Sequence, residues 1–409
     1  MKNYNFLIIG GGVAGTTAAE DIRKNNTDAS IAIVSDEPYP FYSRIMLSKP
    51  QVFLEQVPLE SIFKKKNEWY TDNTVDLIAG QSATNLNAEK KEITLSDKTV
   101  LKYDKLLLAI GTDARTLGLE NEDLDGINCV RTLDDAKKII AGRKKAKKAV
   151  VVGGGFIGFE MCDILRQADI DVTLIIREKT FWGHLLGKKA GNILEKTLTD
   201  HNVTIIKEDE IIKINGTERV SEIITKQGKA LPCDMLIVGI GVQCPIKTLD
   251  PNKTLECGHG IIVNEYLESP QKDIWAAGDC AEYKDVILGE QVLMGNWANS
   301  QLQGKVAAQN MLGNKTPFKA VTSYMCHAFS VPIAFIGDVR AGDGKEIIER
   351  ELEDENGYAQ LTVFDNRVIG AALINQTQSL KPISMLIQNR VDISDKQKIL
   401  LNGDLKTLV

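Results

Sequence analysis

The sequence GGGVAG at residues 10–15 decides the fold of this chain. It follows the apolar stretch FLII at residues 6–9 and precedes TTAAEDI at residues 16–22, so it lies between a predicted strand and a predicted helix. In such a turn the first glycine permits a tight bend, the second lets the backbone approach a pyrophosphate, and the third lets the helix pack closely on the strand. The free N–H groups at the start of the helix then face the phosphates. The residues predicted to bind a dinucleotide here are Gly10, Gly12, Val13, Ala14 and Gly15.

The same pattern occurs a second time, in AVVVGGGFIGFE at residues 149–160. Both copies continue into a helix that ends in arginine, at Arg23 and Arg166, and then reach an apolar strand, at residues 31–34 and 172–175. The chain therefore repeats a whole strand–helix–strand unit. Two such units predict two bound dinucleotides; the alternative is two Rossmann units of which one is empty. The binding residues predicted in the second copy are Gly153, Gly155, Phe156, Ile157 and Gly158.

Composition restricts the class of protein. A chain of 409 residues has room for two or three domains, and 43% hydrophobic with 25% charged residues is typical of a globular protein. A net charge of −6 argues against general nucleic-acid binding. We expect no membrane span and no signal peptide, because no apolar run is long enough and the polar start leads straight into the first strand. The seven cysteines are scattered and form no C-x-x-C pair, which predicts a reducing cytoplasm and no metal centre.

Polar residues follow the second strand. An acidic residue at this strand end, Asp36 or Glu37, can bind the hydroxyls of a ribose. Arg44 and Lys49 offer positive charge for phosphates or for a ring that becomes anionic on reduction. The alternative is a plain loop followed by a helix.

Three later strands end in a manner that suggests a nearby ligand. Residues 106–111 form an apolar stretch that ends at Gly111, and residues 236–241 repeat this pattern and end at Gly241. Residues 274–280 form a strand that ends in Gly278-Asp279. Short strands are expected near residues 93–95 and 102–103, and helices from Asp134 and over 379–390; residues 291–312 are expected to be largely helical. Residues 358–364 and 368–374 flank a short polar turn and predict a β-hairpin.

Taken together, these motifs resemble the FAD-dependent pyridine nucleotide–disulphide oxidoreductase superfamily over about residues 1–375. The resemblance implies FAD at the first glycine turn, NAD(P)H at the second, and Asp279 on the ribityl chain. It implies an α/β fold with two Rossmann-like domains, one inserted in the other, and a small C-terminal α+β domain. The expected domains are an FAD-binding domain of residues 1–115 and 245–316, an NAD(P)-binding domain of residues 116–244, and an interface or acceptor domain of residues 317–409.

Within that superfamily, PFYSRIMLSK at residues 40–49 resembles a segment of rubredoxin reductases, ferredoxin reductases and the flavoprotein part of nitrite reductases. Gly295-Asn296-Trp297 followed by Gln303-Gly304 points the same way. In such enzymes the residues matching Lys49 and Glu160 pair beside the flavin N5, which implies a catalytic role for both here. The remaining cofactor-binding residues implied are Ala83, Ala109, Gly111, Gly241, Gly278, Asp279, Asn296 and Trp297.

The chain departs from the superfamily pattern in two places. Ser43 and Arg44 stand where the peroxidase and coenzyme A-disulfide branch carries a redox cysteine, so electrons are expected to leave the flavin directly. The strand at residues 172–175 is followed by Ile176, Arg177 and Glu178, whereas NADH enzymes usually place a glutamate first. Arg177 pairing with a 2′-phosphate favours NADPH; the alternative is that Arg177 points to solvent and Glu178 reaches the ribose.

These expectations amount to a cytoplasmic enzyme that passes electrons from NAD(P)H through FAD to a small redox protein, such as rubredoxin, or to a small-molecule acceptor. We expect a monomer or homodimer. Two alternatives stay open: an NAD(P)H oxidase or nitrite-reductase-type reductase component, and a flavin-bearing interaction protein that resembles apoptosis-inducing factor.

Overall fold

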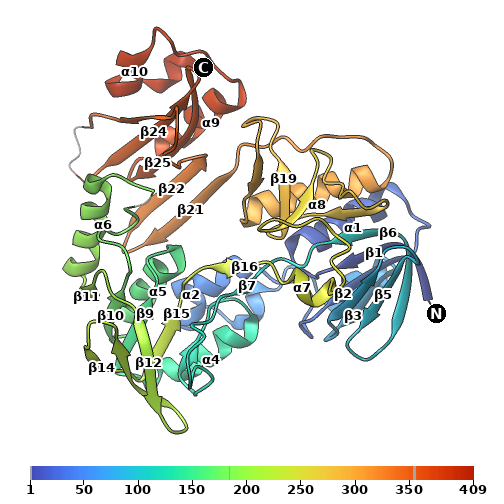
Figure 1. Ribbon diagram of the computed structural model, residues 1–409, viewed down its shortest axis with the longest axis horizontal. Helices are drawn as coiled ribbons and strands as arrows, with labels where there is room; N and C mark the ends of the chain where they lie inside the picture. The colour runs from blue at the N-terminus through green and yellow to red at the C-terminus, as the bar shows by residue number, and fades with distance from the viewer. Residues whose placement is uncertain (1, 184, 353–355) are drawn as a thin grey trace. The chain divides into compact units, whose positions relative to one another are not determined.

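The computed structural model describes residues 2–183, 185–352 and 356–409, and the chain divides into two compact units (Figure 1). The first unit comprises the described residues through Ser43, then Ile62–Asp113 and Gln243–Thr322. The second comprises the described residues of Arg44–Ser61, Ala114–Val242 and Ser323–Val409. Each unit is therefore built from three separate segments of the chain.

The first unit centres on a sheet of strands that run parallel around the first glycine turn. Its strand order is β3-β2-β1-β6-β5-β4, and β18 also pairs with β6. Leu7 of β1 lies between Ala32 of β2 and Leu106 of β6, and both pairings are parallel. The elements of this unit are β1 (Lys2–Ile9), α1 (Val13–Asn25), β2 (Ile31–Ser35), α3 (Asn67–Asp72), β3 (Val75–Ala79), β4 (Ala83–Asn87), β5 (Glu92–Leu95), β6 (Val100–Leu108), α7 (Ile246–Leu249), β17 (Ile261–Val263), β18 (Ile274–Ala276), β19 (Ala281–Lys284), β20 (Gln291–Leu293) and α8 (Trp297–Met311).

Parallel strands buried on both faces are continuous apolar runs, and β1 and β2 have that character. Leu7, Ile8, Ala32 and Ile33 are fully buried. Helix α1 packs against α8, so the helix that leaves the first glycine turn meets the last helix of the same unit (Figure 1).

The second unit contains a second parallel sheet, with strand order β11-β10-β9-β15-β8. The order β10-β9-β15 repeats β2-β1-β6 of the first unit, which confirms the internal repeat predicted from the two glycine turns. The elements around this sheet are η1 (Arg44–Ser48), α2 (Pro50–Phe53), β8 (Ile127–Asn128), α4 (Leu133–Arg143), β9 (Lys148–Val152), α5 (Phe156–Gln167), β10 (Asp171–Ile175), α6 (Lys188–Asp200), β11 (Val203–Ile206), β12 (Ile211–Gly216), β13 (Val220–Thr225), β14 (Ala230–Pro232) and β15 (Met235–Val238). Three short elements, η2 (Leu59–Ile62), β7 (Asp113–Ala114) and β16 (Val242–Gln243), lie where the chain passes from one unit to the other.

The C-terminal part of the second unit is an antiparallel sheet, drawn in orange to red in Figure 1. Its strand order is β21-β22-β25-β24-β23, and the amphipathic helix α9 packs on β22 and β25 through buried Ile383 and Leu386. The elements are β21 (Ser323–Ala328), β22 (Val331–Gly337), β23 (Glu346–Glu349), β24 (Tyr358–Phe364), β25 (Arg367–Ile374), η3 (Thr377–Ser379), α9 (Leu380–Gln388), α10 (Gln397–Asn402) and η4 (Leu405–Leu408). The predicted hairpin is β24–β25, and the helix predicted over residues 379–390 is α9.

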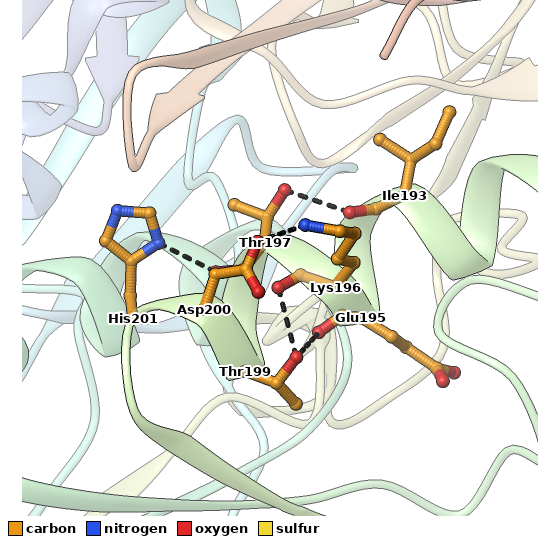
Figure 2. A network of polar contacts seen from close by, with 7 residues as sticks. All are labelled: Ile193, Glu195, Lys196, Thr197, Thr199, Asp200 and His201. Carbon is orange, nitrogen blue, oxygen red and sulfur yellow. Dashed lines mark hydrogen bonds and ion pairs between the residues drawn. The ribbon is translucent and has the colours of Figure 1, made fainter. Parts of the chain in front are cut away.

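The end of α6 connects the two sheets of the second unit. Figure 2 shows polar contacts at the C-terminal end of this helix. The hydroxyl of Thr197 donates to the carbonyl of Ile193, and Nδ1 of His201 lies 2.8 Å from the carbonyl oxygen of Thr197. The ring of His201 packs on Phe329, at the turn between β21 and β22, with 4.6 Å between ring centroids. The contacts of Thr197 stay within the end of the helix, and the ring contact of His201 joins that end to the C-terminal sheet.

Some predicted element boundaries were wrong. The expected strands at residues 102–103 and 106–111 form a single strand, β6, which ends at Leu108. Residues 291–312, expected to be largely helical, contain the short strand β20 before α8 begins at Trp297 and fills most of the stretch. In the described part of the chain, no helix combines the length and the apolar character that crossing a membrane requires.

Candidate functional site

The first glycine turn has the shape that a pyrophosphate requires. A Cβ on Gly10, whose φ is +116°, would lie 2.0 Å from the carbonyl oxygen of Ala109, and a Cβ on Gly15 would lie 2.0 Å from the carbonyl oxygen of Gly10. Both positions therefore require glycine. Gly12 is different, because a Cβ there would meet nothing within 4 Å. The first and third glycines are needed by the fold, and the second faces open space in which a ligand can approach the backbone.

The Gly278-Asp279 motif lies beside this turn. A Cβ on Gly278 would come within 3.2 Å of the side chain of Ala14. Oδ1 of Asp279 accepts a hydrogen bond from the hydroxyl of Ser300 at 3.0 Å. Helix α8 approaches so closely that a Cβ on Gly304 would lie 2.2 Å from the carbonyl oxygen of Ala14. Motifs from the beginning and the end of the first unit's sequence therefore meet at one place in its fold.

A buried amide at this position lacks one partner. Gln303 is fully buried, and its Oε1 accepts a hydrogen bond from the backbone N–H of Gly278 at 2.7 Å. Its Nε2 has no hydrogen-bond partner within the described structure. An unsatisfied buried donor costs roughly 1–3 kcal/mol, so a ligand acceptor at this position would remove that cost. The residues present therefore fit a dinucleotide, and Gln303 is a candidate binding residue that the sequence analysis used only as a family marker.

The other residues predicted to bind the first nucleotide are spread around this unit. Asp36 is exposed directly after β2, while the carboxylate of Glu37 accepts a hydrogen bond from the hydroxyl of Tyr42 at 2.6 Å. Asn296 caps α8 by accepting from the N–H of Asn299 at 2.9 Å. Val13 begins α1, Ala109 follows β6, and Gly111 has a φ of +66°. The ring of Trp297 stacks on that of Phe41 with 5.6 Å between centroids. Ala83 lies on β4, which β5 and β6 separate from β1.

The second glycine turn reproduces the backbone of the first. A Cβ on Gly153, whose φ is +112°, would lie 2.2 Å from the carbonyl oxygen of Gly239, and a Cβ on Gly158 would lie 2.1 Å from that of Gly153. At Gly155 the nearest atom would be 4.0 Å away, so this middle position is again open. Gly241 has a φ of +102° and open space where a Cβ would be. The second unit thus offers a second site for a pyrophosphate.

Helix α5, which leaves this turn, carries a buried ion pair. The ammonium of Lys49 pairs with Oε1 of Glu160, as expected from the sequence. The side chain of Glu160 is 3% exposed and that of Lys49 is 24% exposed. Arg44 begins the short helix η1 that precedes Lys49, and its guanidinium donates to the carbonyl of Arg131 at 3.0 Å. A charge pair this deeply buried is costly to assemble and more costly to break by removing one partner.

Two residues of β21 that the sequence analysis did not single out lie against the same helix. Burial and the negative charge of Glu160 raise the pKa of the Tyr324 hydroxyl and of the Cys326 thiol. Both groups therefore stay protonated at neutral pH. No local pattern in the sequence indicates this contact, because β21 and α5 are far apart along the chain.

An aromatic cluster surrounds the first residue of α5. The ring of Phe156 lies 4.0 Å from that of Tyr324, 4.8 Å from that of Trp182 and 5.3 Å from that of Phe335, measured between centroids. Trp182 has a φ of +54°, which is a strained conformation for a bulky side chain. Ile157, the next residue of α5, is half-buried. The cluster forms an apolar wall beside the second glycine turn.

At the end of β10, the two candidate residues for ribose recognition differ in position. Arg177 is exposed, and its charge helps to lower the pKa of Glu210, although Lys226 is the main cause of that shift. Oε2 of Glu178 would lie 3.7 Å from a Cβ on Gly154, inside the glycine turn. This geometry favours the alternative in which Glu178, rather than Arg177, faces the ribose.

These features define a chain with two Rossmann units, each with an open glycine turn at the carboxyl edge of a parallel sheet. Comparison with known families agrees: residues 4–304 match the model of pyridine nucleotide-disulphide oxidoreductases, and residues 323–391 match that of the rubredoxin NAD+ reductase C-terminal domain. The chain belongs to the pyridine nucleotide–disulphide oxidoreductase family. It is an oxidoreductase, and its cofactors are FAD and NAD(P)H.

Similar proteins cover nearly the whole chain. The ferredoxin–NAD(+) reductase component of the biphenyl dioxygenase system of Paraburkholderia xenovorans (strain LB400) is 28% identical over 402 residues, 98% of this chain and 97% of that protein. The nitrite reductase [NAD(P)H] of Bacillus subtilis (strain 168) is also 28% identical over 402 residues, but the chain spans only 49% of its length. A solved ferredoxin reductase from Rhodopseudomonas palustris has the same fold, with a TM-score of 0.89 at 22% identity, covering 98% of this chain and 99% of that one.

Proposed function

We propose that this protein transfers a hydride from NAD(P)H to FAD and passes the electrons to a small external redox carrier such as a rubredoxin or ferredoxin. The observation that carries the proposal is the occurrence of two glycine turns of matching backbone geometry in one chain. Each has its first and third glycines closed by carbonyl oxygens and its middle glycine, Gly12 or Gly155, open. A reaction between two dinucleotide cofactors needs both turns.

The protein's own residues bind and orient the cofactors, and they exclude water from the reacting atoms. When bound, FAD supplies a ring that accepts a hydride and releases electrons one or two at a time. The turns at Gly12 and Gly155 bind the pyrophosphates, and Asp279 accepts hydrogen bonds from the ribityl hydroxyls. The buried Lys49–Glu160 pair holds fixed charges on helix α5, the helix that leaves the second turn. The aromatic wall of Phe156 excludes water from the nicotinamide end.

No cysteine takes part in the proposed transfer. Ser43 and Arg44 occupy the positions at which the resemblance places the redox cysteine of the peroxidase and coenzyme A-disulfide branch, and Ser43 is buried. The described cysteines are all free, which also fits a cytoplasmic location. Electrons therefore leave the flavin directly for the acceptor. The 97% coverage of a ferredoxin reductase component supports a small redox protein as partner. The enzyme acts as a monomer or homodimer.

A second candidate is a reductase component of a nitrite-reducing system. It is favoured by the match with the Bacillus subtilis nitrite reductase [NAD(P)H], of whose length the chain spans 49%.

An acceptor panel separates a carrier reductase from an NAD(P)H oxidase. The holoprotein is reduced anaerobically with one equivalent of NAD(P)H, then mixed with rubredoxin, a plant-type ferredoxin, nitrite or air-saturated buffer, and flavin reoxidation is followed. Reoxidation by a small iron–sulfur protein at least tenfold faster than by oxygen is the expected result. If oxygen reoxidised the flavin fastest, the protein would be an NAD(P)H oxidase and the proposed carrier reductase function would be wrong.

A further inference from the structure

The backbone of Lys49 is held by a single turn of helix. Lys49 directly precedes α2, and its carbonyl oxygen accepts hydrogen bonds from the N–H groups of Val52 at 3.1 Å and Phe53 at 3.2 Å. A helix of four residues has too few internal hydrogen bonds to be stable by itself. Its last carbonyl groups also lack partners within the helix. The position of Lys49 therefore depends on what fixes the other end of α2.

Arg143, the last residue of α4, binds that end. Its Nε donates to the carbonyl oxygen of Phe53, and its Nη2 donates to Oε2 of Glu55 at 2.8 Å. The neighbouring Lys144 donates to Oε1 of the same carboxylate at 2.9 Å. The side chain of Arg143 is only 15% exposed. A planar guanidinium that binds a carbonyl and a carboxylate together fixes direction as well as distance, and a cation is favourable at the C-terminal end of a helix.

Glutamate at position 55 is unfavourable for the backbone alone. Glu55 has a φ of +55°, in the left-handed region that follows many helices and that glycine usually occupies. A carboxylate is also unfavourable beside the C-terminal end of a helix, where the helix dipole is negative. The ion pairs with Arg143 and Lys144 offset both effects. These ion pairs, rather than local preference, therefore account for a glutamate at this position.

The segment that carries Lys49 also contacts α4 at its other end. The guanidinium of Arg44 donates to the carbonyl of Arg131, shortly before α4 begins. Between these two points, η1 and α2 contact both α4 and α5 (Figure 1). Val52 and Phe53 of α2 are 1% and 0% exposed. Helix α4 therefore supports the segment that brings Lys49 to α5.

We propose that Arg143 is a positioning residue for the Lys49–Glu160 pair. Its guanidinium fixes the carbonyl of Phe53, and the N–H of Phe53 fixes the carbonyl of Lys49. The ammonium of Lys49 is then placed where it meets Glu160 of α5. The consequence for hydride transfer rests on the proposed function; the effect on the ion pair does not.

The first test measures the ion pair itself and needs no turnover. Urea unfolding of the unmodified holoprotein, Lys49→Met, Glu160→Leu and the double variant gives the coupling between the two side chains. The same four proteins are then measured with Arg143→Met added to each. We expect the coupling to fall by about half or more, because the ammonium is no longer held against its partner. Coupling that Arg143→Met leaves unchanged would overturn the proposal.

A milder variant, Glu55→Gln, keeps the test decisive if Arg143→Met does not fold. Glutamine has nearly the size and the backbone preference of glutamate, but it lacks the charge that Arg143 and Lys144 bind. The coupling between Lys49 and Glu160 should fall in the same direction and by less. Unchanged coupling in the Glu55→Gln proteins would likewise contradict a positioning role.

Stopped-flow reduction of the flavin by NAD(P)H tests the consequence for turnover. Arg143→Met should lower the rate by roughly tenfold while FAD stays bound, because a misplaced charge stabilises the reaction less. Added to Lys49→Met, the same change should lower the rate by less than about twofold, since the ammonium that Arg143 places is already absent. Lys137→Met is the matched control on α4: this side chain is 44% exposed and pairs with Asp134, so the rate should change by less than about twofold.

A fall by the same factor with and without Lys49 would show that Arg143 only stabilises the fold, which contradicts the proposal. Failure of the proposed function has a different signature. In that case NAD(P)H leaves the flavin oxidised even in the unmodified protein, while the unfolding measurements still report whether Arg143 places Lys49 against Glu160.

Discussion

The two glycine turns share a backbone but differ in the helix that follows. In each turn a Cβ on the first glycine would lie 2.0 or 2.2 Å from a carbonyl oxygen, and the middle position is open. Helix α1 then carries Val13 and Thr17 at the positions where α5 carries Phe156 and Glu160. Helix α1 packs against α8 through small residues, whereas α5 packs against β21 through an aromatic ring and a buried carboxylate. In the proposed function the turn fixes where a pyrophosphate binds, and the helix face determines which side chains surround it.

The largest expected effect comes from placing a methyl group in each open position. Gly12→Ala and Gly155→Ala have allowed backbone angles and free space, with φ of −76° and −93°, so both variants should fold. Each methyl group keeps a pyrophosphate from the backbone N–H groups, and losing two charge-assisted hydrogen bonds costs about 4 kcal/mol. Gly12→Ala should therefore lose FAD, and Gly155→Ala should keep FAD but require roughly a thousandfold more coenzyme.

Flavin absorbance after gel filtration and coenzyme titration by flavin reduction measure these two effects. The variants serve as controls for each other. If both lost FAD equally, or if neither changed cofactor binding, the assignment of one nucleotide to each turn would be wrong.

The next largest effect concerns the buried charge pair that distinguishes α5 from α1. Lys49→Met or Glu160→Leu leaves one buried charge without its partner, which should lower the free energy of unfolding by about 3 kcal/mol. The double variant should lose less than the sum of the two single variants. Flavin reduction by NAD(P)H should slow in both single variants while FAD stays bound. Urea unfolding and stopped-flow absorbance of all four proteins complete the cycle; additive effects would contradict a coupled pair.

Asp279 tests the part of the first site that the second lacks. Asp279→Ala should weaken FAD binding by about 2 kcal/mol, roughly thirtyfold, because a charged acceptor for ligand hydroxyls is lost. Asp279→Asn keeps one acceptor oxygen and should lose less. Dialysis followed by flavin absorbance measures retention. Full occupancy of FAD in Asp279→Ala would rule out this residue as a ligand of the ribityl chain.

The smallest effect distinguishes the two candidates at the end of β10. Glu178→Ala should shift the ratio of kcat/KM for NADH and NADPH toward NADPH by roughly three- to tenfold, because a carboxylate beside the turn repels a 2′-phosphate. Arg177→Ala, at the neighbouring exposed position, is the matched control and should change the ratio less. A larger shift toward NADH in Arg177→Ala would restore the interpretation in which the arginine binds the phosphate.

Local sequence patterns were sufficient for the turns. Gly10 and Gly153 could be predicted because the tight bend between strand and helix leaves no room for a side chain. The Lys49–Glu160 contact followed from a family resemblance, since nothing local relates two residues so far apart along the chain. The unsatisfied amide of Gln303 and the contact of Cys326 with α5 could not be predicted. They depend on the register between elements that are distant in the sequence, and that register is set by packing.

The grouping of Arg44–Ser61 with the second unit has the same cause. The chain leaves the first unit at Arg44 and returns to it at Ile62, and Lys49 in between supplies the ammonium that Glu160 requires. Hydrophobic periodicity cannot predict that this segment belongs to the second unit, because its helix α2 is a single short turn, Pro50–Phe53. A prediction of domains from sequence motifs assigns this segment to the first domain by default.

The central claim is that electrons pass from NAD(P)H to the flavin without a thiol. The most direct measurement is anaerobic stopped-flow absorbance of the yellow holoprotein, before and after alkylation of its accessible cysteines, on mixing with NADH or NADPH. The account predicts that at least one coenzyme bleaches the flavin within seconds and that alkylation leaves the rate largely unchanged. Flavin that stays oxidised with both coenzymes, or reduction that alkylation abolishes while FAD stays bound, would contradict it.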